Sequence, residues 1–166
     1  MSISIVVSHH IGIIQLKERF MLAGHLALVT AALFTGAAVY VNWAEQAARL
    51  QLDDCALLKE WKPAYKRGTM MQGPLAILGF LFALTAWWQS GQWLWLVGAV
   101  LMIANWPYTL LGIMPTNNRL MAIDAKDGGP SSRALIEKWG WLHAGRSALG
   151  ALATLTFLGA LHAQPV

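Results

Sequence analysis

Residues 70–114 read MMQGPLAILGFLFALTAWWQSGQWLWLVGAVLMIANWPYTLLGIM, and this stretch decides the fold. It contains no charged residue, and its two apolar halves are separated only by QSGQ at 89–92. A helix rises about 1.5 Å per residue, so about 20 apolar residues cross the roughly 30 Å hydrocarbon core of a bilayer. A linker this short joins antiparallel helices. The stretch therefore predicts a hairpin of two membrane-spanning helices, at about 70–88 and 93–114.

Two further apolar segments lie outside this hairpin. Residues 20–43 contain no charge, and residues 139–161 contain one, Arg146. Hydrophobic residues make up 57% of the chain and charged residues 12%, whereas soluble domains have about 45–50% and about 25%. We therefore expect one membrane domain over 1–166, an all-α polytopic four-helix bundle whose partner is the lipid bilayer. Residues 1–16 are expected to form a short arm in the membrane interface.

Two longer polar connections join the predicted spans, loop one at 44–69 and loop three at 115–138. In loop one, Asp53 or Asp54 can cap a helix start. A short amphipathic helix is predicted there, with Pro63 as a local obstacle. Its apolar stripe consists of Leu57, Leu58, Trp61 and Tyr65. In loop three, the turn-forming DGGPS run predicts that the last helix begins near Ser132 and projects from the membrane.

The basic residues indicate an orientation. Loops one and three hold most of the Lys and Arg, whereas Lys17 and Arg19 lie on the opposite side. The positive-inside rule places loops one and three in the cytoplasm and both termini outside, in a membrane of the bacterial inner-membrane type. Two aromatic belts are expected at the boundaries. The predicted members are Trp43, Trp106, Trp139 and Trp141 on the cytoplasmic side and Trp87, Trp88, Trp93 and Trp95 on the outer side.

The net charge and the cysteine count exclude some classes of function. A formal charge of +4, dispersed along the chain, does not indicate a nucleic-acid partner. Cys55 is the single cysteine, which excludes an intrachain disulfide and a cysteine-based metal site. The histidine spacings do not predict a metal site either. Whether the chain forms a homo-oligomer stays open.

Polar side chains gather at the loop-one and loop-three end of the predicted bundle. On three helices, spacings of three or four residues place them on one face: Asn42 with Glu45, Asn105 with Thr109, and Trp139 with His143 and Arg146. Lipid would penalise these groups, so we expect them to face inward and to form a pocket for a hydrophobic small molecule. The candidate substrate-binding residues are Asn42, Asn105, Thr109, Asn117, Trp139, Trp61 and Tyr65. The candidate catalytic residues are His143, Arg146 and Glu45.

Each candidate also has a structural interpretation. Arg146 can pair with Glu45 as a lock between helices, or extend to the interface. His143 can be a hydrogen-bonded interface residue. The remaining alternatives are interhelical hydrogen bonding for Asn105 and Thr109, capping for Asn117, and packing for Trp61 and Tyr65.

Several motifs resemble those of the anthrone-oxygenase-like family of small four-helix membrane proteins. They are Asn105-Trp-Pro-Tyr-Thr109, Ile113-Met-Pro-Thr-Asn117-Asn-Arg-Leu120, and Leu135-x-x-x-Trp139-x-x-x-His143-x-x-Arg146. Its bacterial branch is similar in Tyr40-Val-Asn42-Trp-x-Glu45 with Arg49, and in Trp61-x-x-x-Tyr65-Lys-Arg-Gly68. The resemblance covers about 21–161. It implies oxidation of polyketide anthrones to anthraquinones with molecular oxygen, without a classical cofactor.

These observations favour two possible functions. The first is a membrane-embedded oxidoreductase or oxygenase acting on a hydrophobic, phenolic or polyketide-like molecule. In it, His143 is the general base, Arg146 stabilises the resulting anion, and Glu45 orients one of them. The alternative is non-catalytic, a helix-bundle scaffold or a lipid or quinone binder in which the polar cluster only locks the helices.

Overall fold

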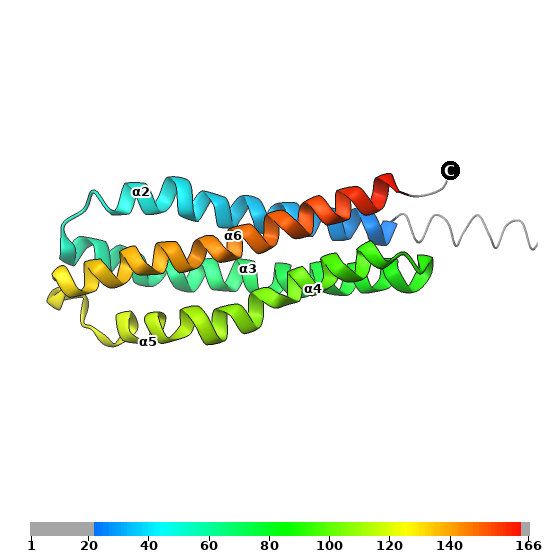
Figure 1. Cartoon of the computed structure of the whole chain (residues 1–166). Helices are drawn as coiled ribbons and strands as arrows, with labels where there is room; N and C mark the ends of the chain where they lie inside the picture. Colours follow the sequence, from blue (N-terminus) through cyan, green and yellow to red (C-terminus); the bar gives the residue numbers. More distant parts are fainter. Residues whose placement is uncertain (1–21, 164–166) are drawn as a thin grey trace, which may run out of the picture.

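The computed structural model describes residues 22–163 as an elongated antiparallel bundle of four long helices (Figure 1). The first, Leu22–Arg49, ends in η1 (Val41–Glu45) and α2 (Gln46–Arg49). The others are α3 (Asp54–Ser90), the run of α4 (Trp93–Tyr108), η2 (Thr109–Ile113) and α5 (Met114–Ala122), and α6 (Pro130–His162), which follows the short η3 (Ala125–Asp127). All four helices are long and apolar enough to cross a membrane. The predicted four-helix membrane bundle is confirmed, and the arm expected at 1–16 lies outside the described residues.

The start of α3 agrees with the predicted cap but not with a separate helix. The Asp53 carboxylate accepts a hydrogen bond from the Ala56 N–H at 2.9 Å, and Leu57 and Trp61 are fully buried. The predicted amphipathic segment in loop one is helical, but it is not short: it continues directly into the second span as part of α3. Pro63 lies on the exposed side of α3, where a helix tolerates a bend. The buried side chains of Leu57 and Trp61 keep the preceding helical turns packed against the bundle.

The start of α6 closes the same end of the bundle. The Ser132 hydroxyl accepts from the Gly129 N–H at 3.0 Å and donates to the Gly129 carbonyl at 2.8 Å, as a turn followed by a cap requires. Arg133 then donates to Asp54 Oδ1 at 2.5 Å and to the Leu50 carbonyl at 3.0 Å. The loops at this end are therefore tied together, which positions the polar segment of the bundle that follows.

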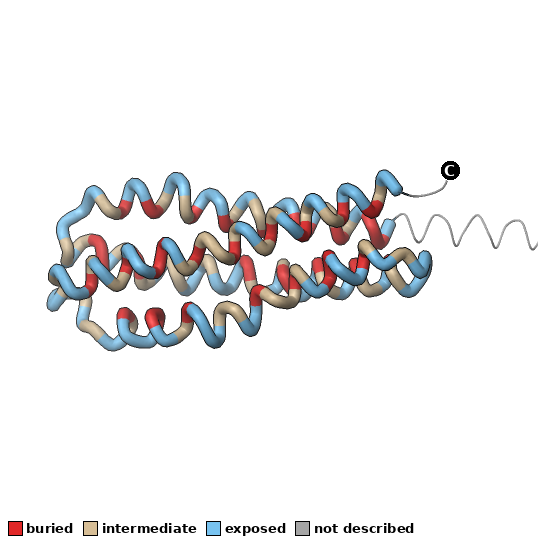
Figure 2. The backbone as a smooth tube through the Cα atoms, in the orientation of Figure 1, coloured by how far each residue is buried: buried red, intermediate tan, exposed pale blue. Residues whose placement is uncertain are grey.

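Small residues let the helices approach closely along the other half of the bundle. Figure 2 shows the buried positions along the inner faces, where alanines and a few aromatic rings form the core. A Cβ atom at Gly98 would lie 2.1 Å from Phe157 Cε1, so only glycine fits there. Without a hydrophobic effect between helices in lipid, such close packing is a main source of association.

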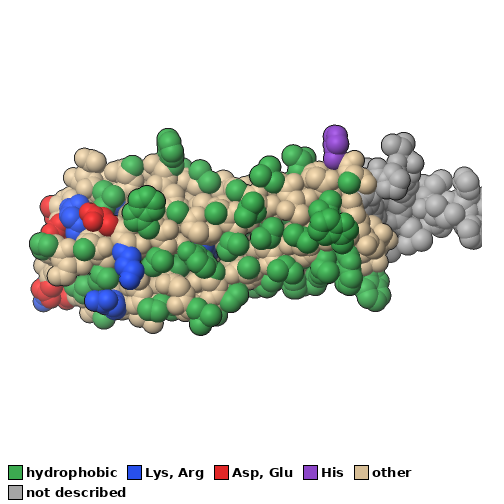
Figure 3. All heavy atoms as spheres, viewed as in Figure 1, with side chains coloured by type: hydrophobic (Ala, Val, Ile, Leu, Met, Phe, Trp, Pro, Cys, Tyr) green, Lys and Arg blue, Asp and Glu red, His purple; other side chains and the backbone are tan. Residues whose placement is uncertain are grey.

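The surface agrees with a bilayer environment. Figure 3 shows hydrophobic side chains along most of the length of the molecule and charges gathered at one end. Trp43, Trp88 and Trp141 are each 83% exposed, as interface anchors should be. Trp95 and Trp139, also predicted as belt members, are 0% and 4% exposed because both rings fill the interior between helices, so neither faces outward as an anchor.

Candidate functional site

Two π-helical turns, one in the first helix and one in the third, position the polar site. In η1 the Gln46 N–H bonds the Val41 carbonyl, and in η2 the Met114 N–H bonds the Thr109 carbonyl, five residues back in each case. Pro115 lacks the N–H that would bond Leu111, which favours the wider turn in η2. Such turns are frequent at functional sites because they redirect side chains.

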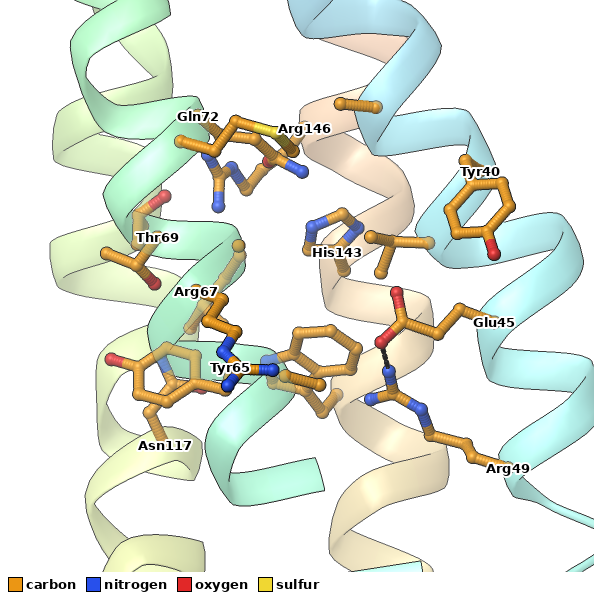
Figure 4. Close-up of a pocket in the computed structure, with 18 residues that line it drawn as sticks. Tyr40, Glu45, Arg49, Tyr65, Arg67, Thr69, Gln72, Asn117, His143 and Arg146 are labelled. Atoms are coloured by element: carbon orange, nitrogen blue, oxygen red, sulfur yellow. Dashed lines mark hydrogen bonds and ion pairs between the residues drawn. The ribbon is translucent and has the colours of Figure 1, made fainter. Parts of the chain in front are cut away.

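A cavity of about 350 Å³ lies between the four helices beside these turns. Figure 4 shows His143 and Arg146 pointing into it from α6, with Gln72 of α3 beside Arg146. Seven of the predicted site residues line it: Glu45, Tyr65, Thr109, Asn117, Trp139, His143 and Arg146. Its other lining residues are Ala37, Tyr40, Val41, Arg49, Ala64, Arg67, Gly68, Thr69, Met71, Gln72 and Ile113. The volume is near the lower end of the range of about 300–1,000 Å³ usual for ligand sites.

His143 is held by a hydrogen-bond network from the first helix. Asn42 Nδ2 donates to the Gly140 carbonyl at 2.8 Å, which fixes the orientation of the amide. Asn42 Oδ1 therefore faces His143 Nδ1 at 2.9 Å and also accepts from the Ser147 hydroxyl at 2.7 Å. Because Oδ1 can only accept, Nδ1 of the neutral ring carries the proton. The other ring nitrogen, Nε2, is then the proton acceptor, and His143 lines the cavity.

Arg146 lies one turn further along α6. It is 9% exposed, its guanidinium lies 5.4 Å from the centroid of the Phe34 ring, and its Nε has no hydrogen-bond partner. Within residues 22–163 it forms no ion pair, so the alternative in which Glu45 locks Arg146 is not observed. A buried guanidinium without a carboxylate is costly unless another anion compensates it.

Glu45 pairs with a different arginine, Arg49, which is four residues along the same helix. Arg49 Nε also lies 3.1 Å from Glu60 Oε2, and its guanidinium is 5.6 Å from the centroid of Trp139. We expected Glu45 to orient His143 or Arg146, but Asn42 takes the position beside His143. Glu45 reaches the cavity as one member of a Glu–Arg–Glu cluster.

Aromatic rings form the end of the site nearest the loops. Trp61 stacks on Tyr65 with centroids 5.0 Å apart, and it meets the edge of Trp139 at 5.7 Å. Trp139 in turn lies 4.9 Å from the His143 ring. Trp61 is fully buried and does not line the cavity. It packs behind Tyr65 and Trp139, whose rings do line it.

The remaining predicted residues occupy different positions. Asn117 is 1% exposed, lines the cavity, and its Oδ1 has no hydrogen-bond partner. Asn105 is 2% exposed and donates to the Leu101 and Met102 carbonyls of its own helix, at 3.3 and 3.2 Å. It lines a second pocket rather than the cavity.

Two buried polar residues that line the cavity, Gln72 and Arg49, were not among the predicted site residues. Gln72 is 1% exposed, lines the cavity, and its Oε1 has no partner. Its signal was a strongly polar side chain inside a predicted span. For Arg49 the signal was its spacing of four residues from Glu45, which predicts an ion pair on a helix.

Among the described residues, no group of three or more His, Cys, Asp or Glu could hold a metal ion.

Comparisons with known proteins agree with the motifs. A family model described as anthrone oxygenase matches residues 61–156, from Trp61 in α3 to Thr156 in α6. A curated anthrone oxygenase from Claviceps purpurea (strain 20.1) is 31% identical over 109 residues. That match covers 58% of this chain and 63% of the fungal protein, so the chain spans less than two thirds of that relative's length. No solved structure matches the chain.

Proposed function

Because the chain belongs to the anthrone oxygenase family, we propose that it is a membrane-embedded oxygenase acting on a hydrophobic, phenolic or polyketide-like small molecule. The observation that carries the proposal is the pair formed by His143 and Arg146 on one face of α6. Both line a cavity formed by four apolar helices. His143 supplies a proton acceptor, and Arg146 supplies a positive charge that has no ion-pair partner among the described residues.

The first step of the proposed reaction is removal of a proton by His143. With Nδ1 donating to Asn42, Nε2 is free to accept a proton from an acidic C–H or O–H of the substrate. The anion that forms is an enolate or phenolate, and the Arg146 guanidinium stabilises its oxygen. Arg49 is less suited to this role, since two glutamates already balance its charge.

The second step is the reaction of the anion with molecular oxygen. For an anthrone, the enolate carbon passes an electron to O₂ and the two radicals combine, giving a hydroperoxide once the proton returns from His143. Removal of the second C–H proton then forms the carbonyl and breaks the O–O bond, and the leaving hydroxide becomes water. The methylene carbon thus becomes a carbonyl, with one oxygen atom in the product and one in water.

The cavity suits a flat polar-edged ring system. Trp139 provides an aromatic wall beside His143, and Tyr65 lies at the end of the cavity nearest the loops. Unpartnered amide oxygens on Asn117 and Gln72 can accept hydrogen bonds from substrate hydroxyls. We propose that Thr109, across the cavity on η2, helps to position the substrate.

The proposed orientation follows the charge distribution. The charged end of the bundle, with loops one and three, lies in the cytoplasm, and the opposite end, with Leu22 and Ala163, lies outside. We propose the bacterial inner membrane as the location. The cavity is then closer to the cytoplasmic side.

The test is turnover of anthrone by the protein reconstituted in liposomes, followed as anthraquinone formed above the protein-free rate. His143→Ala should abolish turnover and leave the bundle folded, as judged by circular dichroism and gel filtration. His162→Ala is the matched control, since this exposed histidine lies at the far end of α6. Wild-type activity in His143→Ala would contradict the mechanism.

A further inference from the structure

A second pocket, of about 320 Å³, lies between α3 and the third helix. Its lining is apolar, including one glycine, except for the amide of Asn105, two threonines and one arginine. Its lining residues are Thr69, Gly73, Pro74, Ala76, Ile77, Asn105, Trp106, Thr109, Leu110, Met114 and Arg146. Apart from Arg146 and Thr109, the residues of this apolar pocket have no role in the reaction proposed above.

The apolar pocket adjoins the central cavity. Thr69, Thr109 and Arg146 line both. These shared side chains, among them Thr69 of α3 and Arg146 of α6, form the boundary between the central cavity and the apolar pocket. Arg146 is the one charged residue among the described lining of the apolar pocket, and it forms no ion pair within residues 22–163.

The other side of the apolar pocket faces outward. Ile77, Trp106 and Leu110, which lie at its rim, are 38%, 41% and 51% exposed. All three lie in helices long and apolar enough to span a bilayer, and Trp106 belongs to the aromatic belt predicted near the cytoplasmic boundary. The pocket therefore opens between two helices onto the apolar outer surface of the bundle, with the charge of Arg146 at its inner end.

We propose that the apolar pocket is the second half of the ligand site and the entrance to it from the bilayer. A flat hydrophobic molecule binds across both hollows, with its ionisable oxygen against Arg146 and its apolar rings between α3 and the third helix. This inference rests on the proposed function, because it takes the ligand to be such a molecule. A substrate dissolved in lipid then reaches His143 without crossing the charged end of the protein.

Cysteine protection tests the two hollows separately. In a Cys55→Ser background, which removes the single native thiol, Gly73→Cys reports on the apolar pocket and Gly68→Cys on the central cavity. Both positions have room: a Cβ at Gly73 would lie 3.9 Å from Trp106 Cζ2, and one at Gly68 has nothing within 4 Å. Leu81→Cys, exposed on α3 outside both hollows, is the matched control.

The probe is anthrone, and the reagents are lipid-soluble pyrene maleimide and a membrane-impermeant maleimide, applied to liposomes. We expect only the lipid-soluble reagent to modify Gly73→Cys. Anthrone at about ten times its dissociation constant should slow that modification, and the modification of Gly68→Cys, about tenfold by mass action. Modification of Leu81→Cys should not change.

The other outcomes contradict either the extended site, the entrance from the bilayer or the proposed substrate class. Protection of Gly68→Cys alone would overturn the extended site and leave the proposed function standing. Labelling of Gly73→Cys by the impermeant reagent would overturn the entrance from the bilayer. Protection of neither cysteine would overturn the extended site together with the proposed substrate class.

Discussion

Replacement of Asn42 by Ala is the perturbation whose effect can be worked out most fully from the structure. The amide of Asn42 bonds the Gly140 carbonyl, the Ser147 hydroxyl and the His143 ring, at 2.8, 2.7 and 2.9 Å. All three partners are on α6, so one side chain ties the first helix to the helix that carries the proposed base. The Asn42→Ala variant removes all three bonds without introducing a clash.

The expected cost follows from hydrogen bonds measured in other membrane proteins. Interhelical hydrogen bonds there average about 0.6 kcal/mol each, so losing three should lower the free energy of unfolding by about 2 kcal/mol. The ring of His143 also loses the acceptor that fixes its tautomer and direction. Misplacing a reacting group by about 1 Å can reduce turnover about a hundredfold, and we expect a fall of that order.

The assay combines unfolding by sodium dodecyl sulfate in mixed micelles with anthrone turnover in liposomes. Ser147→Ala is the matched control, because it removes only one of the three bonds and leaves the contact between Asn42 and His143. It should cost about 0.6 kcal/mol and keep most of the turnover. Equal effects of Asn42→Ala and Ser147→Ala in both measurements would show that the Asn42 network does not hold His143 in place.

Three further predictions concern packing, charge and orientation. Gly98→Ala would place a methyl group 2.1 Å from Phe157 Cε1 and should cost about 1–3 kcal/mol in the same unfolding assay, whereas Gly159→Ala meets nothing within 4 Å and should be nearly neutral. Arg49→Met should lower the free energy of unfolding by about 1–3 kcal/mol, less than for a fully buried pair, since both partner glutamates are partly exposed; an unchanged stability would show that the cluster is not structural. A membrane-impermeant maleimide should label the exposed Cys55 in inverted vesicles and not in intact cells; labelling in intact cells would reverse the proposed orientation.

Much of the fold was predictable because membrane helices are specified by length and polarity. The hairpin at 70–114, the cap at Asp53 and the start of α6 all follow from local rules that need no knowledge of distant contacts. The continuity of α3 through Pro63 was not predictable in the same way. It depends on which side of the helix the proline occupies and on the packing of the turns before it, and both are set by tertiary structure.

The position of the site was predictable, but its pairings were not. Helical spacing was enough to place His143 and Arg146 on one face at the same depth as Glu45. Which side chain contacts His143 depends on the rotation of the first helix, and η1 alters that rotation by adding a residue to one turn. In the structure Asn42, rather than Glu45, contacts the histidine. The second pocket had no sequence signal, since its lining is ordinary for a membrane helix.

The most direct test of the central claim is anthrone-dependent oxygen consumption by the reconstituted protein, measured together with the anthraquinone formed. For the wild type, we expect one molecule of oxygen to be consumed per anthraquinone formed above the protein-free rate, without accumulation of hydrogen peroxide. His143→Ala should show only the protein-free rate. Equal rates for wild type and His143→Ala would contradict the claim that this cavity carries out oxygenation.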